Sequence, residues 1–576
     1  MIKAKEIIEN LPQVNPEYNE TKWRLKLDKN ENIYSIPNYI ISAIKNMDFD
    51  KISKYPNPDK LINKISNHYN IEYNNILLSN CTKEALRTVF DVYLEQDSEA
   101  IFYNNEPNLN QYIDKIKPCY FGDIKETKNS INEKTKIFYI SSPNKLTGEL
   151  IRPSKIEELT KEFKDILFVI DCSYINFAQN ISLFDFFDLA KENENVVIIK
   201  SFSHDFSLAG LGLCFVYSNK SIIDNLKKTA FNNANSVALE CGYSVLNNEH
   251  YFEEIKQQNI IAKELLYEGL KEKGFKPYES EANFILCNFS DYCDFYYQKL
   301  KNNGVIVRKF DKNSIFSTHL QITIPKTGGV KFILELLNKK DLLIFDMDGV
   351  VFDTSESYTN AIIQTFKHFS GFEVSKDEIN KTKNLGGYNC DWNTTKHLLE
   401  EHEFYIDIED IKTVFQDLFY NPELENKEFL INKEKLLISK ETFETLSKKY
   451  DLVIFTGRLG FELDYSLKKF EINKFFNYKI TADDLLEDEL KPNPKGVFEI
   501  LKHCPHKSVK YLGDSVDDII AGNKANVCTI GVINKNADYS AMMNNFKHLC
   551  ANYILKDINN LTQFLEENEQ KEINLV

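Results

Sequence analysis

The stretch "LLIFDMDGVVFD" (residues 342–353) consists of an apolar run followed by two closely spaced aspartates, Asp346 and Asp348. An apolar run of this length, rich in branched residues, predicts a buried β-strand. Side chains two residues apart in an extended chain lie on the same side, so both carboxylates can face one site at the carboxyl end of the strand. The stretch therefore predicts an α/β domain with an acidic site beyond this strand.

Three further signals follow in the same half of the chain, each at a strand end or in a loop. The segments are "DLVIFTGR" (451–458), "ELKPNPKG" (489–496) and "VKYLGDSVDD" (509–518). They contribute Thr456 and Gly457, Lys491, and Asp514 with Asp518. Each signal alone is weak, because an aspartate after a strand is more often a cap or a turn. The ordered set favours one composite site.

This set of residues suits reactions on phosphate. A carboxylate that attacks a phosphomonoester dianion needs its charge offset by a divalent metal and a lysine. A second carboxyl group two residues further on can protonate the leaving alcohol and then deprotonate water. Asp346, Asp514 and the backbone at position 348 offer the hard oxygen ligands that Mg²⁺ prefers. The residues predict an Mg²⁺-dependent phosphatase.

With these motifs, residues 341–555 resemble the haloacid-dehalogenase (HAD) superfamily phosphatases, and within it the phosphoglycolate-phosphatase-like branch. The resemblance implies that Asp346 is the nucleophile, forming an aspartyl-phosphate, and that Asp348 is the general acid/base. It further implies that Thr456, next to Gly457, holds the phosphoryl group and that Lys491 neutralises charge. Mg²⁺ is then bound at Asp346, Asp348, Asp514 and Asp518.

A helical insert between the first two motifs, at about 357–440, matches the mobile cap of that family. Its segment "KNLGGYNCDWN" (383–393) places Trp392 near Lys383 and Asn389. A loop of this composition can reach over a substrate, which makes these three residues candidate substrate contacts. The alternative interpretation is a capped turn with a buried tryptophan.

Residues 1–340 alternate apolar strands, near 136–142, 166–174 and 195–202, with amphipathic helices, which predicts a further α/β domain. The segments "LDKNENIY" (27–34), "KYPNP" (54–58), "SPNKLTGELI" (142–151), "VIDCSYINFA" (169–178) and "KSFSHDFSLAGLGL" (200–213) are similar to those of the histidinol-phosphate aminotransferase group of fold-type-I pyridoxal-phosphate (PLP) enzymes. The resemblance implies their fold, and a vestigial cofactor site at Tyr55, Asp171 and Tyr174.

Several positions depart from that family. His204 stands where the family has its Schiff-base lysine, and imidazole forms no stable aldimine. The other departures are Lys145, Leu109, Cys81 and Lys83 in "NCTKEA" (80–85), Gly212 and Gln321. We interpret His204 as a polar filler that hydrogen-bonds to Asp171, and Lys200 as a residue that caps its strand. PLP binding and transamination are therefore not expected.

Three other functions stay open for the whole chain. A relocated Schiff-base lysine, at Lys145 or Lys200, would make the protein a bifunctional aminotransferase and phosphatase. A ligand bound by the first half could instead gate the phosphatase, as in a regulatory protein. A non-enzymatic partner protein is the third possibility, which the complete 346/348/456/491/514 set disfavours.

Length and composition bound the remaining expectations. The 576 residues predict an aminotransferase-like domain over 1–340 and a phosphatase domain over 341–576. A net charge of −16 without a lysine- or arginine-rich block argues against nucleic acid as a partner. The sequence shows no signal peptide and no membrane-spanning run, and its 11 scattered cysteines suit the cytoplasm. We expect a homodimer built on 1–340 and a small phosphorylated metabolite as substrate, with histidinol phosphate as one candidate.

Overall fold

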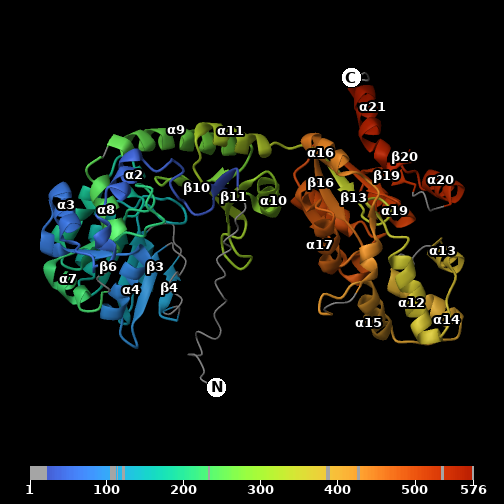
Figure 1. Ribbon diagram of the computed structural model, residues 1–576, viewed down its shortest axis with the longest axis horizontal. Helices are drawn as coiled ribbons and strands as arrows, with labels where there is room; N and C mark the ends of the chain where they lie inside the picture. Colours follow the sequence, from blue (N-terminus) through green and yellow to red (C-terminus); the bar gives the residue numbers. More distant parts are fainter. Residues whose placement is uncertain are drawn as a thin grey trace. The chain divides into compact units, whose positions relative to one another are not determined.

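A computed structural model describes residues 23–103, 112, 114–119, 124–230, 234–248, 250–384, 390–424, 428–533 and 538–573. The chain divides into two compact units (Figure 1). The first comprises residues 1–290 and 303–337, and the second comprises 291–302 and 338–576. The chain therefore passes from one unit to the other three times.

The first unit contains two β-sheets and the helices that cover them. Its strands are β1 Leu25–Leu27, β2 Ile76–Ser79, β3 Glu99–Tyr103, β4 Ile116–Cys119, β5 Thr135–Ser141, β6 Leu167–Asp171, β7 Val196–Ser201, β8 Cys214–Tyr217, β9 Lys276–Pro277, β10 Phe284–Asn288, β11 Val305–Lys309 and β12 His319–Thr323. Its helices are α2 Asn38–Lys45, α3 Asp59–Tyr69, α4 Thr82–Tyr93, α5 Pro153–Glu162, α6 Leu183–Glu192, α7 Lys220–Lys227, α8 Ser236–Val245, α9 His250–Glu272 and α11 Thr327–Leu336.

The larger sheet of this unit has seven strands in the order β2-β8-β7-β6-β5-β3-β4. The strands from β7 to β4 run parallel, whereas β8 is antiparallel to both of its neighbours. Strands β6 and β7 are buried along their whole length, as expected for parallel strands covered by helices on both faces. Asp171 ends β6, which places it at the carboxyl edge of this sheet.

The smaller sheet has the order β1-β11-β12-β10-β9 and is mainly antiparallel. The long helix α9 and helix α11 pack side by side (Figure 1). At their contact, a Cβ atom at Gly269 would lie 2.4 Å from a methyl carbon of Leu334, so a side chain there would require Leu334 to move. Two sheets with this helical covering form the fold-type-I arrangement that the sequence predicted.

The second unit is built on one parallel sheet with the order β17-β16-β13-β18-β19-β20. Its strands are β13 Asp341–Phe345, β14 Phe352–Asp353, β15 Lys435–Leu436, β16 Tyr450–Phe455, β17 Phe476–Ile480, β18 Val509–Gly513, β19 Cys528–Val532 and β20 Tyr553–Leu555. Its helices are α10 Cys293–Asn302, α12 Tyr358–Ser370, α13 Lys376–Asn384, α14 Asp391–Glu401, α15 Ile408–Phe419, α16 Lys440–Lys449, α17 Gly460–Lys469, α18 Lys495–His503, α19 Val516–Lys524, α20 Tyr539–His548 and α21 Leu561–Ile573.

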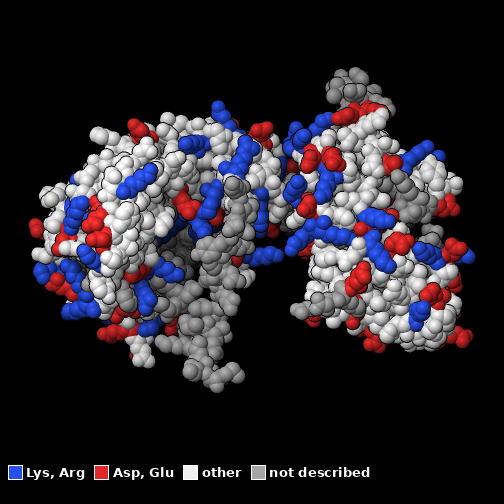
Figure 2. All heavy atoms as spheres, in the orientation of Figure 1, with Lys and Arg blue, Asp and Glu red and all other residues white. Residues whose placement is uncertain are grey.

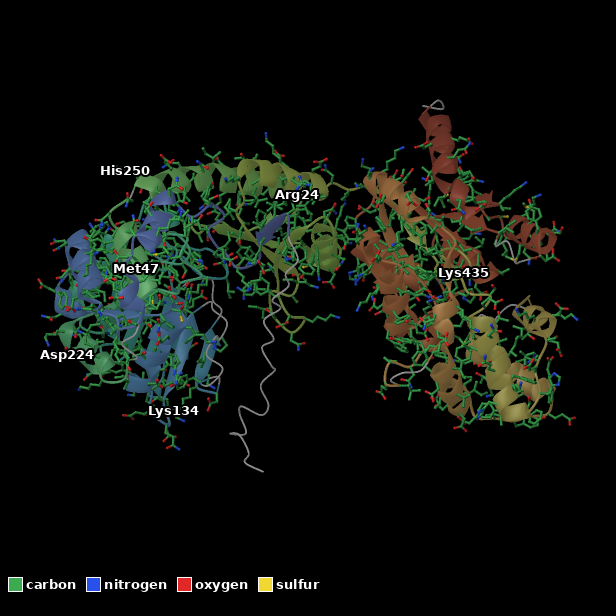
Figure 3. The ribbon with its side chains drawn as sticks, in the orientation of Figure 1. Arg24, Met47, Lys134, Asp224, His250 and Lys435 are labelled. Carbon is green, nitrogen blue, oxygen red and sulfur yellow. The ribbon has the colours of Figure 1, made fainter. Side chains whose placement is uncertain are left out.

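A helical insertion leaves this unit between β14 and β15, which pair as a short antiparallel ribbon. Helices α12 to α15 share an apolar core of their own, centred on residues such as Phe366, Leu399 and Phe415. In Figure 1 these helices form a group apart from the strands of the sheet, and the labelled Lys435 in Figure 3 marks the return strand β15. The insertion occupies the place that the sequence predicted for a cap.

Helix α10 lies in sequence between β10 and β11 but belongs to the second unit. It packs against β17 and α18, and the Lys299 Nζ atom donates to Asp451 Oδ2 at 2.8 Å. Both side chains are at least 97% buried, with exposed fractions of 3% and 1%. Asn302 Nδ2 donates to the carbonyl oxygen of Phe476 at 2.9 Å. The second unit therefore includes a helix encoded well before residue 341.

The structure agrees with the predicted α/β fold class for both halves of the chain. Among the described residues, every helix is too short or too polar to cross a membrane. Acidic and basic side chains are interspersed on the face of each unit that Figure 2 shows.

Replacing Lys299 by methionine (Lys299→Met) is expected to destabilise the second unit. The change leaves the buried Asp451 carboxylate without its cation, and breaking a buried pair in this way typically costs about 3–5 kcal/mol. Differential scanning calorimetry of the full chain measures the effect. The exposed Lys301→Met is the matched control on the same helix, and equal transitions in the two variants would contradict the structural role of this ion pair.

Candidate functional site

The carboxyl edge of the second unit's sheet gathers the residues predicted for phosphate chemistry. Strand β13 lies between β16 and β18, so Asp346 follows the central strand, with Thr456 and Asp514 following its two neighbours. Ligand oxygens of Asp346, Asp514 and Asp518 all lie within 4.8 Å of one another. The parallel sheet thus brings together side chains from three distant parts of the sequence.

Lys491, in the loop before α18, forms ion pairs with two members of this cluster. Its Nζ atom lies 2.7 Å from Asp346 Oδ1 and 2.7 Å from Asp518 Oδ1. The ammonium group also lies over the rings of Phe455 and Tyr511, at 4.7 and 5.7 Å from their centroids. A single lysine therefore neutralises part of the charge of a buried acidic cluster.

Asp518 is fixed by the start of helix α19. It forms a capping box with Ser515, whose backbone nitrogen and hydroxyl donate to Asp518 Oδ2 at 3.1 and 2.7 Å. Tyr511 donates its hydroxyl to Asp518 Oδ1 at 2.6 Å. With Lys491 on the same oxygen, these contacts orient Asp518 within the cluster and leave it little freedom to move.

The ionisation of the cluster reflects its crowding. Burial raises the pKa of Asp346 to about 7, with Asp518 and Asp348 adding to the rise and Lys491 opposing it. Burial and the charges of Asp346 and Asp518 raise the pKa of Asp514 well above its usual range. Three carboxylates facing one lysine form an oxygen donor set short of positive charge. This donor set fits a divalent cation such as Mg²⁺, with Asp346 and Asp514 as the side chains available to hold it.

Close packing of the backbone also shapes the carboxyl edge of the second unit's sheet. Gly349 has a φ of +75°, and a Cβ atom there would lie 1.7 Å from Asp514 Oδ2. A side chain at position 349 is therefore incompatible with the observed place of Asp514. Thr456 is buried, and its Oγ1 atom accepts a hydrogen bond from the backbone nitrogen of Arg458 at 3.2 Å. Beside it, a Cβ atom at Gly457 would meet nothing within 4 Å, which leaves the backbone there accessible.

The Asp348 side chain points to a different partner from the other aspartates. Its carboxylate forms an ion pair with Arg458 and is not one of the three clustered carboxylates. Of the metal-binding residues predicted from the sequence, the structure therefore brings together the side chains at 346, 514 and 518. Position 348 can contribute to that group only through its backbone. Sequence reasoning missed Arg458, although it directly follows the Thr456-Gly457 pair, and it also missed Glu434, which no local pattern marks.

The predicted substrate contacts of the insertion are only partly described. The Lys383 side chain and Asn389 lie outside the described residues. Trp392, near the start of α14, packs against the apolar core of the insertion. The Lys412 ammonium lies 5.4 Å from its ring centroid. This partial packing favours the alternative interpretation of Trp392 as a packed residue.

In the first unit, residues of the predicted cofactor site contact one another. Lys145 forms an ion pair with Asp171, whose carboxylate is 99% buried. Tyr139 donates its hydroxyl to Asp171 Oδ2 at 3.0 Å, and the backbone nitrogen of Ser173 donates to Oδ1 at 3.0 Å. A lysine of the protein thus supplies the positive charge that Asp171 faces.

His204 does not contact Asp171 as the sequence interpretation proposed. Its Nδ1 atom lies 2.8 Å from the carbonyl oxygen of Asn30. Its ring stacks on Tyr174 with centroids 4.4 Å apart. Burial lowers the pKa of His204 to about 4, so the imidazole is neutral near pH 7. The acceptor comes from Asn30, in a left-handed turn with a φ of 54°, which residue patterns around His204 could not reveal.

Two other altered positions, Gln321 and Gly212, also make close contacts within the first unit. Gln321 donates from Nε2 to the carbonyl oxygens of Lys145 and Leu146, at 2.9 Å each. At Gly212, with a φ of +56°, a Cβ atom would lie 2.6 Å from the carbonyl oxygen of Asn80. An arginine at position 212 is therefore incompatible with this packing.

The remaining positions predicted for this site lie apart from it or beyond the described chain. Lys200 is buried and ion-paired with Asp205, so it serves as more than a strand cap. Cys81 and Lys83 are exposed at the start of α4, and Leu109 lies outside the described residues. Tyr55 is 94% exposed and contributes nothing to the site within this chain.

Taken together, the two units define a protein of two α/β parts: a fold-type-I aminotransferase-like part and a hydrolase-like part with an acidic site. The family model of class I and II aminotransferases matches residues 24–331, and that of haloacid dehalogenase-like hydrolases matches 343–532. The chain belongs to the class I and II aminotransferase family and carries a haloacid dehalogenase-like hydrolase domain behind it.

Known relatives match the first part of the chain. It is 30% identical over 339 residues to the histidinol-phosphate aminotransferase of Brachyspira hyodysenteriae, covering 56% of this chain and 93% of that protein. It is 29% identical to the enzyme of the same name from Methanocaldococcus jannaschii, covering 55% and 88%. The histidinol-phosphate aminotransferase structure from Sinorhizobium meliloti, solved with pyridoxal-5'-phosphate, shares the fold with a TM-score of 0.52 at 15% identity, covering 58% and 98%.

Pyridoxal phosphate is the cofactor that this fold family implies, and the residues of the first unit do not fit it. Position 204 offers no amine, Asp171 is already paired with Lys145, and Gly212 leaves no room for an arginine side chain. The amine of Lys145 is engaged by Asp171, which also opposes its use as a relocated Schiff-base lysine.

Replacing His204 by lysine (His204→Lys) is expected to leave the protein without transaminase activity. The new amine cannot restore the lost contacts at Asp171, Gly212 and Gln321, and each missing contact costs on the order of 1–3 kcal/mol. Absorbance after addition of PLP, and mass spectrometry after borohydride reduction, measure adduct formation. The unmodified chain is the control. An adduct on its Lys145 or Lys200, or strong transamination by the variant, would overturn this expectation.

Proposed function

We propose that this protein is an Mg²⁺-dependent phosphatase that hydrolyses a small phosphomonoester at the edge of the second unit's sheet. One observation supports the proposal above all others. Asp346, Asp514 and Asp518 converge within 4.8 Å, with Lys491 bridging two of them at 2.7 Å. The hydrolase family match over residues 343–532 supports the same conclusion.

The residues of the site divide the reaction between them. A carboxylate oxygen of Asp346 attacks phosphorus while the bond to the leaving oxygen breaks, and Asp348 gives that oxygen its proton. Asp348 then takes a proton from water, which attacks the phosphorus of the aspartyl-phosphate. This second attack frees Asp346 and releases inorganic phosphate. Lys491 and Thr456 hold the phosphoryl oxygens, and Mg²⁺, when bound, offsets the charge of the carboxylates and the phosphate.

The aminotransferase-like unit acts in this proposal as a catalytically inactive scaffold. The ion pair of Lys145 with Asp171 and the stacking of His204 on Tyr174 support this role.

We further propose that this unit forms a homodimer. Phe49, Ile52 and Tyr55 are 62%, 60% and 94% exposed within one short stretch, a cost that a second copy would relieve. A full chain that sediments as a monomer would contradict the assembly.

The proposed substrate is a small phosphorylated metabolite. Joined domains often share a pathway, and the matched relatives bear the name of an enzyme of histidinol phosphate. Histidinol phosphate is therefore one candidate. A screen of phosphomonoesters of amino alcohols and sugars against the purified full chain tests this part of the proposal.

The full chain is expected to hydrolyse p-nitrophenyl phosphate with Mg²⁺ and to lose that activity in excess EDTA. Without a cation, the buried carboxylates and the substrate dianion repel each other at close range. Release of p-nitrophenolate measures the rate. Restoration by added Mg²⁺ is the control for damage by the chelator, and an undiminished rate in EDTA would exclude a metal requirement.

The variant Asp346→Asn is expected to lose at least about 10³-fold in kcat, because an amide of nearly the same shape is not a nucleophile. Its folding is checked by calorimetry beside the wild type. The variant Asp464→Asn, on an exposed aspartate of α17, is the matched control and keeps the wild-type rate. Ordinary turnover by Asp346→Asn would remove the covalent route.

A further inference from the structure

Arg458 lies on the loop after β16, two residues beyond Thr456, and its guanidinium group is fully buried. Its Nε atom donates to Asp348 Oδ1 at 2.9 Å, and Nη2 contacts the same oxygen. The other side of the guanidinium faces Glu434, with Nη2 at 2.7 Å from Oε1 and Nη1 at 3.3 Å from Oε2. One buried cation thus binds two carboxylates from distant parts of the chain.

The surroundings of Arg458 fix its orientation. Its guanidinium carbon lies 4.8 Å from the ring centroid of Phe352 and 5.3 Å from that of Tyr358. Nη1 also donates to Ser466 Oγ at 3.1 Å, and this hydroxyl donates in turn to Glu434 Oε2 at 2.7 Å. A planar guanidinium held by rings and paired along two edges cannot rotate without losing several of these contacts.

This geometry has a consequence for Asp348. Both contacts from Arg458 fall on Oδ1, so Arg458 leaves Oδ2 to other partners. The Asp348 side chain is 33% exposed, whereas Arg458 and Glu434 are fully buried. The arginine therefore anchors one oxygen of the carboxylate inside the protein, and the carboxylate itself remains accessible from solvent.

Glu434 directly precedes β15, the strand on which the chain returns from the helical insertion. A second contact ties the insertion to the same region: Tyr358, which begins α12, donates its hydroxyl to Glu462 Oε2 at 3.1 Å. Both ends of the insertion are therefore joined to the loop and helix that follow Thr456.

We propose that Arg458 is a positioning residue for Asp348, holding it where it serves as general acid and anchoring it, through Glu434, to the returning end of the insertion. The proposal rests on the phosphatase function proposed above. Arg458 acts on Asp348 and does not itself contact the phosphoryl group.

The test compares p-nitrophenyl phosphate with phenyl phosphate, two substrates of similar shape. Phenol is the weaker acid, so phenolate departure depends more on a proton from Asp348. The value of kcat/KM reports only the steps up to departure of the phenol, so the later hydrolysis of the aspartyl-phosphate does not affect it. General acid catalysis contributes typically 10²–10⁴-fold.

The variant Arg458→Lys keeps the charge but loses the fork that joins both carboxylates. Its kcat/KM is expected to fall at least about 10-fold more for phenyl phosphate than for p-nitrophenyl phosphate. Lys479→Met, which removes an exposed ion pair of the same unit, is the control and changes neither value. If calorimetry shows Arg458→Lys to be unfolded, the double variant Arg458→Met/Glu434→Gln replaces it, because it removes both members of the buried pair.

Equal losses on both substrates, or no loss on either, would overturn the positioning role while leaving the phosphatase function in place. A wild-type chain that hydrolyses neither substrate would instead overturn the proposed function, and the positioning role with it. The two failures are therefore distinguishable in one set of measurements.

Discussion

The mutual repulsion of buried carboxylates is the constraint around which the hydrolase unit is organised. Asp346 and Asp514 are brought together because parallel strands end at one edge of the sheet, and Asp518 joins them from the first turn of α19. A negative charge on any of these carboxylates is costly to hold away from water unless a cation is near. Lys491 supplies part of the positive charge that the carboxylates require. The pKa values of Asp346 and Asp514 are nevertheless raised, which indicates that the positive charge is insufficient. A site that is short of positive charge favours the binding of a metal ion.

In the aminotransferase-like unit, by contrast, a lysine of the protein balances the charge of the buried carboxylate. Asp171 is buried, as are Asp346 and Asp518 of the hydrolase site, but Lys145 pairs with it directly and lowers its pKa against the effect of burial. With its carboxylate neutralised from within, this site has no charge deficit for a ligand to fill. The two units thus differ in whether the protein itself supplies the balancing charge, and this difference separates a proposed catalytic site from a proposed scaffold.

Much of the hydrolase site could be predicted from the sequence, because three of its residues directly follow apolar strands. Asp346, Thr456 and Asp514 stand directly after β13, β16 and β18, and strand ends in a parallel sheet meet at one edge. The partners of Asp348 could not be predicted in this way. Glu434 meets Arg458 only because the insertion returns beside β14, and no local pattern encodes that return. The contact of His204 with Asn30 escaped prediction for the same reason, since it joins residues 174 positions apart.

Helix α10 shows why a chain of this kind cannot be divided by sequence position alone. The family matches meet near residue 340, yet Lys299, encoded well before that point, provides the cation for Asp451 at the start of β16. Burial raises the pKa of Asp451 and Lys299 opposes that rise, so a chain beginning at residue 341 would carry this acid inside its core without the Lys299 cation. Strand β16 also ends at Thr456, in the proposed active site. The strand that leads to that site is therefore bound, near its start, by a helix supplied by the aminotransferase-like part of the sequence, which is a physical reason for the two parts to remain joined.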